Sequence, residues 1–392
     1  MSNQSTRKSL KICIRHLTPA WHTIVMGTGA VSALASRFHF GQGSEAIQAV
    51  TLLFFFLNLC FFILICGATV ARYWLFPELW SAMLRHPTQS LFIGAFPMGA
   101  ATLINIALVT HQSYSFGGPG FLYALWAFWW LDSAVSLLTA VGMIYVMMSK
   151  HQHSLSQMSA LWLLPFVTLI VASSTGGLLG AALSAHPTYV ALTTAVSFIM
   201  LLMGLSLAIM LITVYLMRLA IHGPLDANLI LSSFIILGPL GQGGFSMLVN
   251  ARNLSHIHLG TALSAEAVQA VCFCAAWALW SMGLIWLCIA FASIYTVFRR
   301  QRVPFSVAYW GTIFPNGVFA LLTVELGTVL ESPVLNFLGA IFSVLVLLLW
   351  MFVFAKTIPA IWDTSVFNSP CVTKLDAETL SSRQDAEPFA GV

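Results

Sequence analysis

The chain has 392 residues, of which 59% are hydrophobic and only 7% are charged. A soluble domain carries roughly a quarter charged residues, so this composition excludes a water-soluble fold and places the chain in a lipid bilayer. The net charge is a small +4, and the seven cysteines are scattered without zinc-binding spacing. We therefore expect no nucleic-acid partner, no metal and no cofactor.

Ten apolar segments are long enough to cross a membrane, which takes about 20 helical residues. We expect these helices to fill residues 17–358, between a cytosolic N-terminus in 1–16 and a disordered cytosolic tail in 359–392. No cleavable signal peptide is expected before the first segment. In chain order the segments are 17–38, 48–71, 88–110, 120–148, 159–183, 187–219, 227–250, 262–298, 304–330 and 333–358.

Lysine and arginine are distributed unevenly between the two sides of these segments. With the N-terminus in the cytosol, fourteen of the sixteen Lys and Arg residues lie on the cytosolic side, and only Arg37 and Arg252 lie outside. Cytosolic loops are normally the ones enriched in positive charge. The bias predicts an even number of spans with both termini in the cytosol.

Proline recurs every 68 to 78 residues, each time in an odd-numbered segment, whereas no even-numbered segment has an interior proline. Broken backbone is tolerated at membrane depth only against protein or beside a water-lined path. The sequence therefore predicts an all-α membrane protein of five helical hairpins, with quasi-fivefold symmetry around a central pore. Kinked odd helices would surround the pore and straight even helices would face lipid. The recurring prolines are Pro19, Pro97, Pro165, Pro239 and Pro315.

The odd segments offer polar but almost uncharged side chains to such a pore. Hydroxyls, amides and free backbone N–H groups can coordinate an anion, whereas a Lys or Arg at mid-depth would hold it too tightly for rapid release. For any single Ser or Thr, the alternative is a hydrogen bond to its own helix backbone. The candidate pathway residues are His22, Thr28, Gly29, Thr102, Asn105, Ser173, Ser174, Thr175, Gln242, Gly243 and Asn316.

Two carboxylates and one aromatic side chain are further candidates. Asp132, on the fourth segment, and Glu325, on the ninth, lie at membrane depth, where carboxylates are functional candidates by default. Each could carry a proton coupled to transport or could brace neighbouring helices. Phe314 precedes Pro315 and could close a narrow pore, the alternative being ordinary packing.

Six stretches together resemble the tellurite-resistance/dicarboxylate transporter family, and within it the fungal sulfite efflux pumps. They extend over almost all of the predicted helices, and the combination is more specific than any one motif. The stretches are His16–Gly29, Phe92–Asn105, Trp129–Ser136, Leu161–Gly177, Gly238–Ser246 and Trp310–Gly327.

The resemblance implies five hairpins around an anion pore and export of sulfite or bisulfite across the fungal plasma membrane. It also implies that an aromatic residue on helix 9 occludes the pore, with Phe314 as first choice and Trp310 as the alternative. A homo-oligomer is compatible with it, and no enzymatic activity is expected. A malate-type dicarboxylate transporter and a gated anion channel are alternatives on the same fold. A membrane oxidoreductase would need paired histidines within spans, where His22 stands alone.

Overall fold

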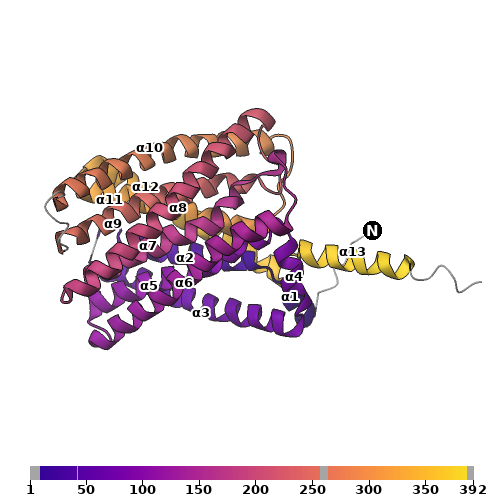
Figure 1. Ribbon diagram of the computed structural model, residues 1–392, viewed down its shortest axis with the longest axis horizontal. Helices are drawn as coiled ribbons and strands as arrows, with labels where there is room; N and C mark the ends of the chain where they lie inside the picture. The colour runs from indigo at the N-terminus through magenta and orange to yellow at the C-terminus, as the bar shows by residue number, and fades with distance from the viewer. Residues whose placement is uncertain (1–8, 42, 257–263, 386–392) are drawn as a thin grey trace, which may run out of the picture.

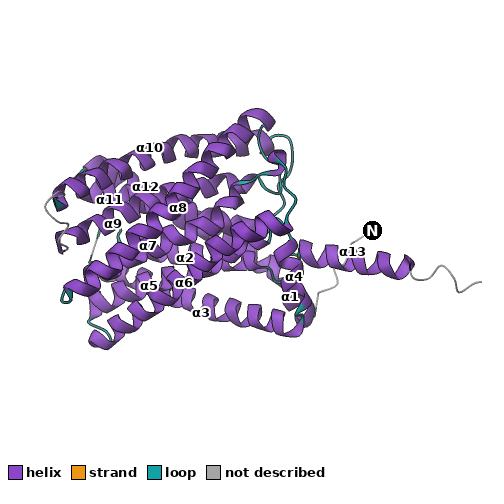
Figure 2. Ribbon diagram, in the orientation of Figure 1, coloured by secondary structure: helices purple, strands orange, loops and turns teal. Residues whose placement is uncertain are grey.

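The computed structural model describes residues 9–41, 43–256 and 264–385, and within these ranges every regular element is a helix (Figures 1 and 2). Nine helices in the described part of the chain are long and apolar enough to cross a membrane. They correspond to the second through tenth predicted segments. The first predicted segment forms a shorter helical unit, Pro19–Ser36, which is not among the nine.

Five helical units are largely buried inside the protein, and each consists of a short 3-10 helix followed directly by an α-helix. Four of the units are long enough to span a membrane. In these four, 61% to 100% of an 18-residue apolar stretch is buried inside the protein. The units are η1 (Pro19–Trp21) with α2 (His22–Ser36), η2 (Ser90–Gly94) with α5 (Ala95–Tyr114), η4 (Ala160–Leu163) with α7 (Leu164–Ala182), η5 (Ile230–Ile236) with α9 (Leu237–Arg252), and η7 (Val307–Thr312) with α11 (Ile313–Val329).

Five long α-helices alternate with these inner units along the chain. In each of them only 22% to 39% of an 18-residue apolar stretch is buried inside the protein, so most of the helix surface is left for lipid. They are α3 (Glu45–Leu75), α6 (Gly118–Lys150), α8 (Pro187–His222), α10 (Ala265–Phe298) and α12 (Pro333–Trp362).

The inner helices contact one another in a closed ring. Helix α2 packs against α5, α5 against α7, α7 against α9, α9 against α11, and α11 returns to α2. Each inner helix also packs against the outer helix that follows it in the chain, as α7 does with α8. Long parallel and antiparallel helices therefore run side by side along the bundle, which is clear in Figure 1.

The recurring prolines lie at the starts of the inner helices. Pro97, Pro165, Pro239 and Pro315 fall in the first turn of their α-helices, and Pro19 opens η1. In the first turn an α-helix has no partner for its N–H groups, so proline costs little there. The predicted mid-helix kinks are thus transitions from 3-10 to α geometry. The outer helices are not proline-free either, because α12 continues through Pro359 to Trp362.

Glycines allow the inner backbones to approach closely. A Cβ on Gly241 of α9 would lie 2.6 Å from the backbone nitrogen of Phe319 on α11. A Cβ on Gly94 of η2 would lie 2.7 Å from the carbonyl oxygen of Leu164 on α7. Such distances exclude any side chain, so these two glycines set the spacing of the ring.

The first and last helices of the described part, α1 (Leu10–His16) and α13 (Pro370–Asp385), lie at one end of the bundle, which we call the terminal face. It also carries α4 (Glu78–Arg85), and the short helix η3 (Leu155–Gln157) is also outside the spans. The remaining short helix, η6 (Asn253–His256), follows α9 at the opposite end.

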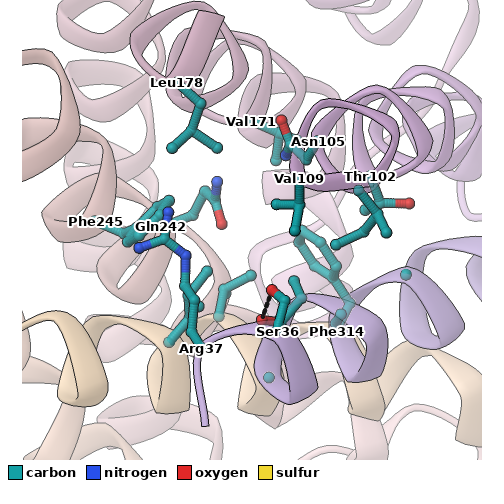
Figure 3. Close-up of a pocket in the computed structure, with 17 residues that line it drawn as sticks. Ser36, Arg37, Thr102, Asn105, Val109, Val171, Leu178, Gln242, Phe245 and Phe314 are labelled. Atoms are coloured by element: carbon teal, nitrogen blue, oxygen red, sulfur yellow. Dashed lines mark hydrogen bonds between the residues drawn. The ribbon is translucent and has the colours of Figure 1, made fainter. Parts of the chain in front are cut away.

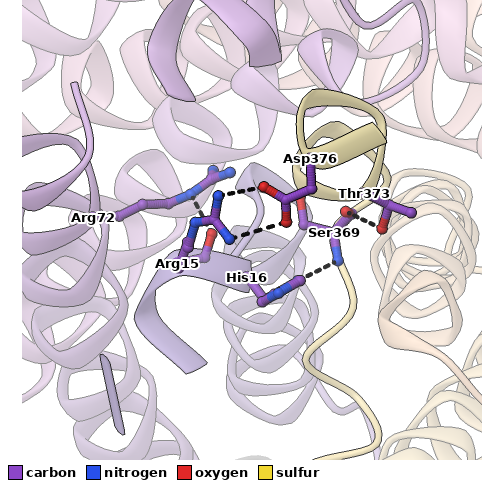
Figure 4. Close-up of polar contacts among 6 residues, drawn as sticks. All are labelled: Arg15, His16, Arg72, Ser369, Thr373 and Asp376. Atoms are coloured by element: carbon purple, nitrogen blue, oxygen red, sulfur yellow. Dashed lines mark hydrogen bonds and ion pairs between the residues drawn. The ribbon is translucent and has the colours of Figure 1, made fainter. Parts of the chain in front are cut away.

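The polar tail differs from the disordered segment that we expected, because residues 370–385 are helical; residues 1–8 and 386–392 lie outside the described part. Two nitrogens of Arg15 donate to the carboxylate of Asp376, at 3.0 and 2.7 Å, and the backbone N–H of Ser369 donates to His16 (Figure 4). Phe367 stacks on Trp21 with ring centroids 5.0 Å apart. Aromatic and ionic contacts thus attach the tail, which its polar composition did not indicate. The hydrogen bond from Arg15 lowers the pKa of Asp376 below its usual value.

Candidate functional site

Three cavities follow one another along the ring of inner helices. The largest, which we call the terminal vestibule, opens at the terminal face and has a volume of about 580 Å³. A middle cavity of about 20 Å³ shares Phe92, Ile235 and Gly311 with the vestibule. A third, of about 40 Å³, contains Arg37 in its wall, and we call it the Arg37 cavity. All five inner units contribute to the wall of each cavity, so the three lie on the axis of the ring.

Phe314 separates the middle cavity from the Arg37 cavity. Its side chain is 3% exposed and belongs to the wall of both. The transition from η7 to α11 places it there, at the first turn of the α-helix. Trp310, the alternative gate, points elsewhere, because its indole N–H donates to Thr357 on α12 at 2.9 Å. The geometry therefore favours Phe314 over Trp310 as a residue that occludes the axis.

Three predicted polar residues line the Arg37 cavity, and two of them present amide groups to it (Figure 3). The amide nitrogen of Gln242 donates to Ser174, which leaves its oxygen for the cavity. Asn105 has a buried Oδ1 with no hydrogen-bond partner among the described residues. Thr102 turns its hydroxyl away, since it donates to the Gly99 carbonyl at 2.7 Å and accepts from Asn58 at 3.2 Å.

The predicted cation-free lining does not hold for this cavity. Arg37, at the C-terminal end of α2, is part of the wall, and its guanidinium lies 5.0 Å from the ring centroid of Phe245. Its Nη1 donates to Glu325 at 2.7 Å, and Arg252 also pairs with Glu325. Sequence reasoning counted Arg37 as a loop charge. A signal was present in the sequence, because Arg37, Arg252 and Glu325 all lie near the outer ends of predicted segments and could therefore pair.

Glu325 therefore has a structural explanation. Its side chain is 3% exposed and lies between two guanidinium groups that approach different carboxylate oxygens. A buried carboxylate is stable when it is paired in this way. Of the two roles that the sequence left open, this geometry supports the brace rather than the proton carrier.

The hydroxyl cluster that begins at Ser173 joins α7 to α9. Ser173 and Ser246 lie 2.8 Å apart through their hydroxyl oxygens, and Asn250 donates to both the hydroxyl and the carbonyl of Ser173. Thr175 donates to a carbonyl of its own helix. Only Ser174 reaches the pathway, through Gln242. The cluster thus supports the wall more than it forms it.

Four other predicted residues line none of the three cavities through a free polar group: three contact outer helices and one bonds to its own helix. Gly29 alone among the α2 candidates lines the Arg37 cavity. His22 lies 3.2 Å from the Thr69 hydroxyl on α3. The hydroxyl of Thr28 accepts from Trp350 on α12 at 3.0 Å. Asn316 donates a hydrogen bond to a carbonyl of its own helix at 2.8 Å. A Cβ on Gly243 would meet Leu205 on α8.

Asp132 lies away from the axis, on the outer helix α6. It is 6% exposed, it lines none of the three cavities, and its Oδ2 has no hydrogen-bond partner among the described residues. The expected bracing hydrogen bond is therefore not found for this oxygen. No group of three or more His, Cys, Asp or Glu side chains in the described ranges could hold a metal ion.

His86 belongs to the wall of the terminal vestibule and follows α4, outside the spans. Its Nδ1 accepts the backbone N–H groups of Thr88 and Gln89, at 3.2 and 3.3 Å. Burial, followed by the nearby charge of Lys374, lowers the pKa of His86 below its ordinary value. The ring is therefore neutral at neutral pH and adds no charge to the vestibule.

Comparison with known proteins gives the context for these cavities. A profile of the SLAC1 voltage-dependent anion channel family matches residues 16–358. The chain belongs to this family. The match extends from the end of α1 almost to the end of α12, so it includes the walls of the middle and Arg37 cavities and most of the vestibule wall, whose last residues, 365–370, lie beyond it. The protein is thus a multi-pass membrane protein of an anion channel and transporter family, as the resemblance predicted.

Within this anion channel family, curated relatives are similar over most of the chain. "Sulfite efflux pump SSU1" of Arthroderma benhamiae is 33% identical over 352 residues, which cover 88% of this chain and 91% of the relative. The protein of the same name from Candida albicans is 28% identical and covers 84% and 71%. A malic acid transport protein of Schizosaccharomyces pombe is 23% identical and covers 86% and 77%.

Proposed function

We propose that the chain exports sulfite or bisulfite across the plasma membrane, along the axis through the three cavities. The observation that carries this proposal is the series of three cavities along the axis of the helix ring, in a protein that is 33% identical to sulfite efflux pumps. Ten helices would cross the bilayer as five hairpins with approximate fivefold symmetry, and the closed ring of inner contacts supports this arrangement.

The orientation that we propose puts both termini in the cytosol. The terminal vestibule then collects the anion, and the Arg37 cavity is its outer exit. The vestibule is more than ten times larger than the Arg37 cavity, which suits a wide entrance that leads to a narrow selective region. The excess of Lys and Arg at the terminal face supports this orientation.

Movement along the axis requires the Phe314 ring to leave its position. An aromatic ring between two small cavities blocks even a small oxyanion, and a change of rotamer would connect them. On the outer side the anion would meet the amide of Asn105, whose N–H groups can donate hydrogen bonds as lost hydration is replaced. Neither Asp132 nor Glu325 lines any of the three cavities, so the proposed route does not need proton transport by a carboxylate.

The test is direct flux from proteoliposomes that contain the purified protein. Vesicles loaded with sulfite should release it faster than protein-free vesicles, and vesicles loaded with malate should not. Malate release without sulfite release would refute the proposal. In a fungus that lacks its own exporter, expression of the chain should restore growth on sulfite.

A second candidate is a malate-type dicarboxylate transporter, which the similarity to a malic acid transport protein favours. The volume of the Arg37 cavity, about 40 Å³, argues against it, because a four-carbon dianion needs more room than a single small oxyanion. A homo-oligomer is compatible with the exposed apolar faces of the outer helices, and crosslinking in native membranes would detect it.

A further inference from the structure

The wall of the Arg37 cavity contains an ion cluster with more positive than negative charge. Glu325 is shared by Arg37 and Arg252, so one carboxylate faces two guanidinium groups. The Glu325 side chain is 3% exposed, whereas Arg37 is 27% exposed and Arg252 is 51% exposed. The negative charge is thus enclosed by protein while both positive charges reach solvent or the cavity. The cluster carries one surplus positive charge.

Within this cluster, the cavity is lined by Arg37, whereas Arg252 is not part of its wall. The guanidinium of Arg37 stacks over the ring of Phe245, which also lines the cavity. Stacking and the bond from Nη1 to Glu325 together fix the plane of the group. A guanidinium has five N–H donors, so several remain for a ligand on the cavity side.

Two amide side chains line the same space. Gln242 lies beside Arg37 in the wall, and Asn105 lies across the cavity (Figure 3). Asn105 also has an unpartnered buried oxygen within the described structure, which marks a side chain not satisfied by the protein alone. The Arg37 guanidinium and the amide N–H groups of Asn105 are both donors on one small cavity, which suits an oxyanion.

We propose that Arg37 directly binds the transported oxyanion at the outer end of the pathway, and that Glu325 weakens this binding so that the anion can leave. This inference rests on the proposed function and assigns its exit site. A single guanidinium in a narrow cavity would hold an anion strongly, because the surroundings screen charge poorly. The shared carboxylate reduces the local positive potential, and the anion competes with it for Arg37.

Four variants of the purified protein in detergent test this assignment by calorimetric titration with sulfite. R37Q and R252Q remove the same charge and the same partner of Glu325, but only Arg37 lines the cavity. R37Q should weaken sulfite binding about tenfold or more, the scale expected for loss of a charged hydrogen bond. R252Q should change it by about threefold or less. E325Q should tighten binding about threefold or more, and R37K should restore most of the affinity that R37Q loses.

Equal weakening by R37Q and R252Q would overturn the assignment, because it would mean a general effect of charge and not a contact. Unchanged or weaker binding by E325Q would also overturn it. If R37Q does not elute as a monodisperse species, R37K and E325Q still decide the question. Sulfite flux by wild-type proteoliposomes is measured in parallel, so that failure of the transport function is recognised separately from failure of the exit site.

Discussion

Replacement of Phe314 by alanine is the sharpest test of the pathway. The ring is buried, belongs to the walls of both the middle cavity and the Arg37 cavity, and follows the transition from η7 to α11. Its removal would merge cavities of about 20 and 40 Å³ into one continuous space. The substitution should therefore increase anion flux.

The size of the increase can be worked from the cost of moving the ring in the wild-type protein. Exposing a buried Phe side chain costs about 1.5–3 kcal/mol, and forcing it out of its preferred rotamer costs about 0.5–1.5 kcal/mol. The sum is about 2–4.5 kcal/mol, and each 1.4 kcal/mol changes a rate tenfold. Flux should rise by roughly 30-fold to 1,000-fold if the ring is the main barrier.

The assay is sulfite efflux from proteoliposomes with matched protein content, with Phe319→Ala as the control. Phe319 lies on the same helix, is 2% exposed and lines none of the three cavities. Its truncation should lower stability by about 3–5 kcal/mol without raising flux. Wild-type flux in Phe314→Ala, or an equal rise in both variants, would refute the role of Phe314 as the barrier.

Three further predictions concern packing and the terminal face. Gly241→Ala should destabilise the protein by about 1–3 kcal/mol, seen as a lower melting temperature in detergent, because the new Cβ meets the Phe319 backbone. The pKa of His86 is lower in the folded protein than in the unfolded chain, where it is about 6.5. The folded state is therefore fully stabilised by the neutral ring above that pH. This stabilisation is lost as the pH falls below it, because the unfolded chain binds the proton first. His86→Asn should flatten the decline in melting temperature between pH 7.5 and 5.5. Asp376→Asn should remove about 0.2–1 kcal/mol of tail attachment to Arg15, and limited proteolysis of the tail should become measurably faster.

Much of the architecture could be predicted from hydropathy and the spacing of proline. The second to tenth segments match the observed helices closely because long apolar runs leave few alternatives. The division into odd and even helices also corresponds to inner and outer positions, since proline and glycine concentrate where helices pack against protein. The sequence did not predict that the helix breaks near the prolines are changes from 3-10 to α geometry. Sequence shows that Pro239 lies in a helix, but not that the preceding turn is 3-10.

The pathway residues were harder to predict because the sequence does not give the rotation of each helix about its axis. His22 and Thr28 lie on the inner helix α2, yet their side chains form hydrogen bonds with α3 and α12 and do not face the axis. Phe314 could be singled out because it immediately precedes Pro315 in the first turn of α11, and its role as a gate stays a prediction. Arg37 was missed because it falls at the very end of the first predicted segment, 17–38, and was counted only as a charge on the outer side.

The inner helical units all begin at the terminal vestibule, and their common direction has an electrostatic consequence. Each α-helix carries a macrodipole equivalent to about half a positive charge at its N-terminus. Five such ends lie around the middle cavity, one short 3-10 helix beyond the vestibule, and point toward the vestibule, while the opposing outer helices lie farther from the axis and cancel them incompletely. The backbone itself therefore favours negative ions at the entrance. Side chains along the route could vary widely without reversing the sign of the ion that enters.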